Sequence, residues 1–214
     1  MTPTPSAVPI VPPAVDDGWL PLDAHPVGRT IAAFATRSFV ANDPHGDRLR
    51  IRYEARAAAL PHATAAEPAA LRAEVWFGPK AEGPPGHAHG GSVAAVLDEA
   101  MGLAVWLAHR AAVAAHIEVD FRNPVPLGLT GRVETTPGPA DERKSSVSAR
   151  LVGPDGTVYG EATGIFVLLG ERHAGRFRGG GALPGGASAG RQWARRSDDC
   201  RTFSSPAPSS SVTR

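Results

Sequence analysis

Residues 92–109, with the sequence SVAAVLDEAMGLAVWLAH, decide the fold class of this 214-residue chain. The stretch contains no proline, is rich in alanine and leucine, and is too long for a strand, so it predicts a helix of about five turns. Apolar residues lie on every side of that helix, which is typical of a helix that is buried nearly all round. We therefore expect the rest of the folded chain to be built around it.

The segments on both sides of the helix alternate apolar and polar residues, the period of a half-buried strand. Leu49, Ile51 and Tyr53, for example, alternate with arginines, and the sequence GPDG at 153–156 predicts a hairpin turn between the last two strands. The predicted strands are residues 49–53, 71–77, 117–121, 129–136, 145–152 and 157–168. This order predicts an α+β fold in which an antiparallel sheet wraps around one long central helix.

Composition divides the chain into three parts: a proline-rich arm at 1–37, a folded domain at 38–169 and a tail at 170–214. The tail contains too few large apolar side chains to offset its ordering entropy, so we expect it to be disordered. It carries a net charge of about +5 and leaves a mildly acidic body, although the whole chain has a formal net charge of +1. We expect a solvated terminus rather than an RNA-binding one.

Several classes of function are disfavoured by composition alone. A net charge of +1 gives no reason to expect nucleic acid or a membrane surface as the main partner. The single cysteine, Cys200, excludes an internal disulfide, a thiolate zinc cage and a C-x-x-C redox pair. The first residues, MTPTPSAVPIVPPAVDD, contain no basic residue and do not resemble a secretory signal, so we expect a cytoplasmic protein.

Two adjacent carboxylates, Asp98 and Glu99, lie in the middle of the predicted helix. Burying an unpaired carboxylate costs several kcal/mol unless it is hydrogen-bonded or protonated. Successive helical residues point about 100° apart, so the two cannot serve one site equally. We expect at least one of them to be functional; a position at an exposed edge or in a salt bridge is the alternative for the other.

The helix is preceded by a tight loop, GPPGHAHGG at 83–91, that ends in two glycines. Backbone N–H groups at a helix start are unpaired and lie at the positive end of the helix dipole, an arrangement that suits an oxyanion hole. Simple capping is the alternative for these glycines. His87 and His89 lack a third ligand of matching context, so a role in acid–base catalysis or in orienting a carbonyl is favoured over a metal site.

The spacing of these candidates predicts an oligomer. Eight residues separate Gly90 from Asp98, which is about 12 Å along a helix. A base and an oxyanion donor must both lie within about 3 Å of one reacting group, so one chain cannot supply both. Two antiparallel copies of the helix could, with Gly90 of one subunit facing Asp98 of the other.

The string HGGSVAAVLDEAMG at 89–102 resembles the hotdog-fold acyl-CoA thioesterases, in the branch that contains the phenylacetate-pathway and 4-hydroxybenzoyl-CoA thioesterases. That family has a His-Gly-Gly helix entrance and an acidic residue nine positions after the histidine, which is Asp98 here. EGPPGHAHGG at 82–91, FRNPVPLG at 121–128 and RKSSVSARLVGPDGTVYGEATGIFVLL at 143–169 are similar to the loop, the segment after the helix and the closing strands of that family.

The resemblance implies a homodimeric or homotetrameric enzyme that hydrolyses acyl-CoA to free acid and coenzyme A without a metal or redox cofactor. Asp98 would be the general base or nucleophile, the Gly90 amide would polarise the thioester carbonyl from the partner subunit, and His89 would orient the carbonyl or the water. The resemblance also implies a group of substrate-contacting residues, which are Gly91, Arg122, Arg143 and Lys144.

Two positions differ from many members of that family. Gly83 stands where relatives carry a water-positioning Asn or Gln, and Ala114, beside Ala115, stands where they carry Ser or Thr. Losing a water-positioning hydroxyl lowers a rate by roughly ten- to a thousand-fold. The alternative function is therefore a non-catalytic acyl-CoA-binding sensor. A hotdog hydratase pairs its acid and histidine at other spacings, and the GGSVA sequence at 90–94 lacks the last glycine of an α/β-hydrolase nucleophile elbow.

Overall fold

The computed structural model describes residues 19–24, 29, 37–56, 70–107 and 111–169. The expected tail and most of the expected N-terminal arm therefore lie outside the described residues. The elements, in chain order, are β1 (Trp19–Pro21), η1 (Leu22–Ala24), β2 (Leu49–Arg56), β3 (Leu71–Phe77), η3 (Pro79–Ala81), α2 (Gly90–Leu107), β4 (Ala112–Phe121), β5 (Thr130–Ala140), β6 (Lys144–Val152) and β7 (Val158–Leu168).

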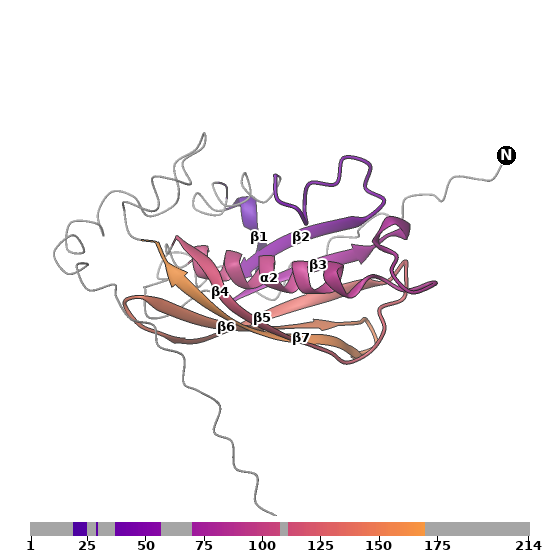
Figure 1. The fold of residues 1–214 in the computed structure, drawn as a ribbon. Helices are drawn as coiled ribbons and strands as arrows, with labels where there is room; N and C mark the ends of the chain where they lie inside the picture. The colour runs from indigo at the N-terminus through magenta and orange to yellow at the C-terminus, as the bar shows by residue number, and fades with distance from the viewer. Residues whose placement is uncertain (1–18, 25–28, 30–36, 57–69, 108–110, 170–214) are drawn as a thin grey trace, which may run out of the picture.

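Within these residues the strands form one seven-stranded sheet with the order β1-β2-β3-β5-β6-β7-β4. All its pairings are antiparallel. Helix α2 lies against the concave side of the curved sheet (Figure 1). Strand β4 follows the helix in sequence but pairs with β7 at the edge of the sheet. The predicted fold class, an antiparallel sheet around one central helix, is confirmed.

The turn between β6 and β7 is built by the predicted GPDG sequence. The Gly156 N–H donates to the Gly153 carbonyl at 3.0 Å, and the Gly153 N–H donates to the Thr157 carbonyl at 2.8 Å. Gly156 adopts a φ of 85°, a conformation that residues with a Cβ rarely accept. The strands that it joins fall within one residue of the predicted ranges.

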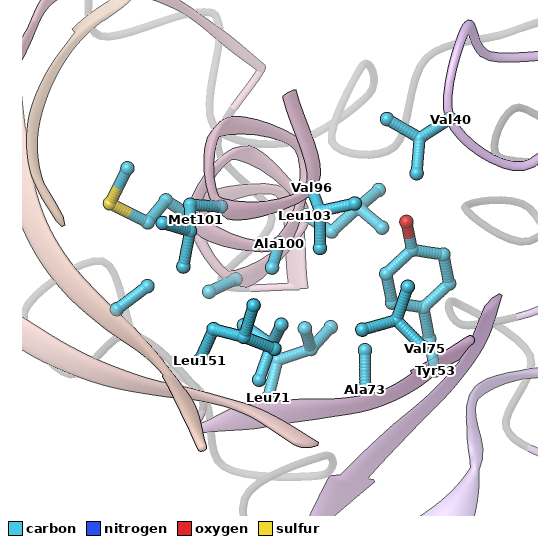
Figure 2. Close-up of a cluster of buried hydrophobic side chains, with 14 of the residues drawn as sticks. Val40, Tyr53, Leu71, Ala73, Val75, Val96, Ala100, Met101, Leu103 and Leu151 are labelled. Atoms are coloured by element: carbon cyan, nitrogen blue, oxygen red, sulfur yellow. The ribbon is translucent and has the colours of Figure 1, made fainter. Parts of the chain in front are cut away.

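The face of the sheet that contacts the helix is recognised from its small residues. A Cβ added at Gly160 would lie 3.3 Å from the Val93 side chain, and one added at Gly164 would lie 3.3 Å from Met101. Because strand side chains alternate, Glu161 lies on the opposite, outer face. The apolar side chains between helix and sheet form the core (Figure 2), and the labelled members are Val40, Tyr53, Leu71, Ala73, Val75, Val96, Ala100, Met101, Leu103 and Leu151.

Helix α2 begins two residues before the predicted start, and its burial differs from the prediction. The expectation that it is buried nearly all round is wrong for the described chain, because the sheet covers only one side. A strip of mainly small residues stays exposed or half-buried on the other side: Gly91, Ala94, Ala95, Asp98 and Gly102. By length and composition the helix could also cross a membrane, but half of it is buried inside the fold, as core helices are.

A short strand lies within the arm predicted at 1–37. Trp19–Pro21 pair with the last residues of β2, and Leu22 is buried against the core. The Trp19 ring lies 4.6 Å from the Arg72 guanidinium carbon and 5.5 Å from that of Arg56, which are cation–π distances. The sheet therefore includes residues well before the predicted domain start at 38.

Candidate active site

The loop before α2 is held by backbone hydrogen bonds on two sides. The His89 N–H donates to the Ala81 carbonyl at 2.7 Å, and the Ala88 N–H donates to the Val125 carbonyl at 2.8 Å. His87 also forms an isolated bridge with Pro126, in the segment after β4. The residues immediately before the helix are thus fixed both to the chain before them and to the chain after β4.

Gly83 lies too close to His89 for a side chain. A Cβ added at Gly83 would lie 2.7 Å from the His89 Cα, a contact that real Cβ atoms essentially never make. An Asn or Gln at this position would require the loop backbone to move. This loop therefore has a steric reason for glycine where the family resemblance led us to look for an amide side chain.

The first N–H groups of α2 differ in their acceptors. The Ser92 and Val93 N–H groups donate to the His89 carbonyl at 2.8 and 3.4 Å, and the Gly91 N–H donates to His89 Nδ1 at 2.9 Å. The Gly90 N–H has no acceptor among the described residues. It is therefore a free donor at the positive end of the helix dipole, the type of group that stabilises an oxyanion.

The hydrogen bond from Gly91 also fixes the tautomer of His89. Because Nδ1 accepts a hydrogen bond, the proton of the neutral ring is on Nε2. The side chain is exposed, so this Nε2–H can donate to a carbonyl oxygen or a water molecule near the helix start. His87 differs, since its Nδ1 lies 3.0 Å from the Pro85 carbonyl oxygen and donates to it.

Phe121 is a site residue that sequence reasoning missed. The alternation of β4 predicts that its ring is buried beside Ile117 and Val119, but the side chain is 58% exposed. A Cβ added at Gly90 would lie 3.3 Å from two atoms of the ring. The ring therefore lies against Gly90, and a side chain at this position would be in tight contact with it. The available signal was its place at the start of the FRNPVPLG segment, which begins at the last residue of β4.

Asp98 lies on the open strip of α2 and makes no hydrogen bond or ion pair within the part of the chain that the structure describes. Its side chain is half-buried among small residues, and this burial raises the pKa of the carboxyl. A carboxylate without a partner, half-buried on an open strip of small residues, is available to a ligand.

Glu99, the next residue, has an opposite environment. Its carboxylate accepts hydrogen bonds from the Tyr53 hydroxyl, the Ser38 hydroxyl and the Val40 N–H. Burial raises the pKa of Glu99, the three donors oppose that rise, and the neighbouring charge of Asp98 adds to it. The alternative considered for one of the two acids, an exposed edge or a salt bridge, does not describe Glu99, which is satisfied by neutral donors.

The basic residues expected at the substrate lie at opposite ends of the sheet. Arg122 follows β4 at the Gly90 end, where it pairs with Glu161 at 2.7 Å and Asp120 at 3.0 Å. Arg143 lies in the exposed turn between β5 and β6, and Lys144 is the first residue of β6. From Lys144 to the part of β6 that is level with Phe121 is seven residues, or about 23 Å.

One chain therefore brings together Gly90, Gly91 and His89, with Phe121 and Arg122 at the same end, but not Asp98, Arg143 or Lys144. Asp98 is two turns further along the same helix, about 12 Å from Gly90. A hollow of about 370 Å³ on the outer face of β4–β7 includes Arg122 but neither Gly90 nor Asp98. The described residues contain no group of three or more His, Cys, Asp or Glu side chains that could hold a metal ion.

Comparison with known proteins agrees with this architecture. Residues 85–158 match the model of the thioesterase superfamily. Acyl-coenzyme A thioesterase THEM4 of Xenopus laevis is 32% identical over 93 residues, which are 43% of this chain and 42% of the relative. Acyl-coenzyme A thioesterase THEM5 of Homo sapiens is 32% identical over 89 residues, 41% of this chain and 36% of the relative. The chain thus spans about two fifths of the length of the curated relatives that it matches.

Solved structures are similar over about half of the chain. A crystal structure of a thioesterase superfamily protein has a TM-score of 0.47 and 26% identity, over 55% of this chain and 56% of that one. A hypothetical thioesterase of Streptococcus pneumoniae, crystallised with coenzyme A, has a TM-score of 0.47 and 14% identity, over 55% and 86%. Residues 85–158 are thus similar to the thioesterase superfamily, and a single helix packed against one antiparallel sheet is the arrangement of the hotdog fold.

Proposed function

We propose that this domain hydrolyses acyl-CoA to a free acid and coenzyme A, in the manner of the phenylacetate-pathway branch of its superfamily. The observation that carries the proposal is a pair of unsatisfied groups on one helix: the free N–H of Gly90 and the unpaired carboxylate of Asp98. The first suits the developing oxyanion of a thioester, and the second suits a base or nucleophile. The curated relatives, which are named acyl-coenzyme A thioesterases, support this reaction class.

A dimer would complete the site. Strand β4 has one free edge in the described sheet and presents the exposed side chains of Val113 and Phe121. A ten-residue edge strand of this kind is a ready template for pairing with a second copy. If two copies of β4 pair antiparallel, the Phe121 end of each lies beside the Val113 end of the other.

The same pairing brings the scattered candidates together. Lys144 is in register with Val167, which pairs with Val113, so the β5–β6 turn of one subunit would approach the Gly90 end of the other. Two antiparallel helices would also place Asp98 of one subunit opposite Gly90 of its partner. Arg122 of one subunit and Arg143 and Lys144 of the other would then flank one substrate, at positions suited to the phosphates of coenzyme A.

The chemistry needs only these groups and water. The Gly90 N–H donates to the thioester oxygen while Asp98 takes a proton from the attacking water, whose oxygen bonds to the carbonyl carbon. The C–S bond then breaks, and the proton passes from Asp98 to the departing thiolate. His89 Nε2–H orients the carbonyl or the water. A pKa raised by burial makes Asp98 a stronger base than an exposed aspartate. In the nucleophile variant of the mechanism, Asp98 attacks the carbonyl and water hydrolyses the anhydride.

Ala114 and Ala115 leave the attacking water with fewer partners. Both are exposed on β4, where the register with β7 shifts between Ala114 and His116. No hydroxyl is available at this bulge, so the water would be held by Asp98 and His89 alone. The same feature favours the second candidate function, a sensor that binds acyl-CoA without hydrolysing it.

Thiol release from a panel of aryl and aliphatic acyl-CoAs, measured for wild type, Asp98→Asn and Glu142→Gln, tests the proposal. Glu142 is an exposed carboxylate in the β5–β6 turn and serves as the matched control. We expect release by wild type and Glu142→Gln and none by Asp98→Asn. Equal release by all three would overturn the role of Asp98. No release by wild type, with acyl-CoA still raising its Tm, would establish the sensor function instead.

A further inference from the structure

Glu99 is a half-buried titratable group that the proposed reaction does not use. Its carboxylate accepts from three donors: the Tyr53 hydroxyl on β2, the Ser38 hydroxyl and the Val40 N–H. Figure 2 shows Val40 and the Tyr53 hydroxyl on the same side of the helix as Val96 and Leu103. We refer to Glu99 and these three donors as the Glu99 cluster.

The donors of the Glu99 cluster are themselves fixed. Tyr53 is only 7% exposed and is in register with Ala73 of β3. The Ser38 hydroxyl also accepts a hydrogen bond from the Ala41 N–H at 2.9 Å. Arg48 Nη2 donates to the Phe39 carbonyl at 2.7 Å, which ties the same turn to the start of β2. The cluster therefore connects α2 both to β2 and to the hydrogen-bonded turn at 38–41.

Apolar packing fixes which side of α2 faces the sheet, because large side chains lie on that side and small ones on the open strip. It specifies small rotations about the helix axis less strictly, because apolar contacts are not directional. A carboxylate with three fixed donors is different, because a rotation would leave buried polar groups without partners. Buried polar groups are known to fix register in this way where apolar contacts alone do not.

We propose that Glu99 is a positioning residue that fixes the rotation of α2 and thereby aims the Asp98 carboxylate at the substrate. The proposal rests on the proposed function, since it assigns to Glu99 an effect that acts through Asp98. The two side chains are adjacent in sequence and project about 100° apart, so holding one determines the direction of the other.

The expected effect on rate follows from the geometry. Side-chain atoms lie about 5–6 Å from a helix axis, so a rotation of about 20° moves a carboxylate by about 2 Å. A displacement of about 1 Å at a reacting group can cost about 100-fold in rate. Losing the cluster should therefore lower kcat while leaving KM nearly unchanged, because Glu99 itself does not contact the substrate.

The test compares Glu99→Met, Glu99→Gln, Tyr53→Phe and the control Thr135→Val. Methionine keeps the length and helix propensity of Glu99 but removes every acceptor, whereas Gln keeps an acceptor oxygen and an NH₂ that can donate to the hydroxyls. Thr135 is buried on β5 and exchanges hydrogen bonds with the Leu71 backbone at 2.8 and 2.9 Å, so its loss disturbs the fold alone. We expect kcat per folded protein to fall about 10- to 100-fold in Glu99→Met but to stay close to the wild-type value in Glu99→Gln. It should fall about 2- to 5-fold in Tyr53→Phe and should not change in Thr135→Val.

A double variant shows whether the effect acts through Asp98. In the Asp98→Asn background, Glu99→Gln and Tyr53→Phe should leave the residual rate unchanged, because there is no carboxylate left to aim. The positioning role would be overturned if all three variants, Glu99→Gln, Tyr53→Phe and the folded fraction of Glu99→Met, had the kcat of wild type. The proposed function would remain intact. Absence of hydrolysis by wild type would overturn the proposed function, and full activity of Asp98→Asn would overturn the role of Asp98; the positioning role would fall with either.

Discussion

The two sides of helix α2 each carry a carboxylate, but in opposite environments. Toward β2, the carboxylate of Glu99 accepts three hydrogen bonds from neutral donors. On the open strip, the carboxylate of Asp98 has no partner within the described residues, although burial raises its pKa. A satisfied buried carboxylate connects parts of the fold, whereas an unsatisfied one lowers stability and is retained for another reason. The comparison therefore assigns a structural role to Glu99 on one side of the helix and a chemical role to Asp98 on the other.

Neutralising each carboxylate in turn should give the largest difference between the two sides. Asp98→Asn removes the proposed base, so we expect kcat to fall by about 10³-fold or more. Glu99→Gln preserves most of its hydrogen bonds, so its loss should stay below about 10-fold. Steady-state hydrolysis of the best acyl-CoA of the panel measures both. Similar losses of kcat in the two variants would contradict the proposed difference in role between Asp98 and Glu99.

The amide at the helix start can be examined by a matched pair of substitutions. Gly90→Pro removes the N–H at a position where proline is compatible with a helix, and the loss of one oxyanion donor should cost about 10²–10³-fold in kcat. Gly90→Ala keeps the N–H but adds a Cβ 3.3 Å from the Phe121 ring, so it measures the steric part alone. Equal effects of Pro and Ala would show that packing against Phe121, and not the N–H, is what matters at this position.

The open strip also has a consequence for the pH dependence of hydrolysis. Burial raises the pKa of Asp98, and only the ionised carboxylate can take a proton from water. The rate should therefore decrease as the pH falls through this raised pKa, at a higher pH than for an exposed aspartate. A kcat/KM profile of wild type from mildly acidic to neutral pH measures this limb. A rate that stays flat down to the ordinary range of carboxyl pKa values would contradict the proposed state of Asp98.

The sequence was sufficient to predict the elements whose apolar residues follow a regular pattern. The helix was located to within two residues because its stretch lacks breakers and follows a glycine pair. Alternation located six of the described strands, although β4 begins at Ala112, five residues before the predicted start at 117. Strand β1 was not predicted because three residues carry no periodic signal. The open strip was not predicted because hydropathy records how apolar a face is and not what covers it.

The candidate site was only partly predictable for a related reason. Gly90 and Asp98 could be singled out because a glycine pair and a buried acid are unusual in any helix. The partners of Glu99 could not, because Tyr53 is 46 residues distant in sequence and only the sheet brings it to the helix. Phe121 was assigned to the buried face because alternation does not show that the end of β4 passes the start of α2.

Thermal stability gives the smallest expected effect, but it compares Asp98 with Glu99 directly, in the absence of substrate. The folded-state pKa of Asp98 is raised, so its contribution to stability is fully present below the pKa of the unfolded chain and is lost as the pH rises through the folded value. At neutral pH the ionised group therefore destabilises the fold, and Asp98→Asn should gain about 1 kcal/mol, or about 2–4 °C in Tm, after allowance for its partial exposure.

The gain should disappear in acid, where wild-type Asp98 is also uncharged. Glu99→Met should change Tm in the opposite direction, because it removes the acceptor of three buried or half-buried donors. Differential scanning calorimetry at one protein concentration, at neutral and acid pH, measures all three proteins under equal conditions. A lower Tm for Asp98→Asn at neutral pH would show that this carboxylate has a stabilising partner. That result would remove the contrast between the two sides of the helix.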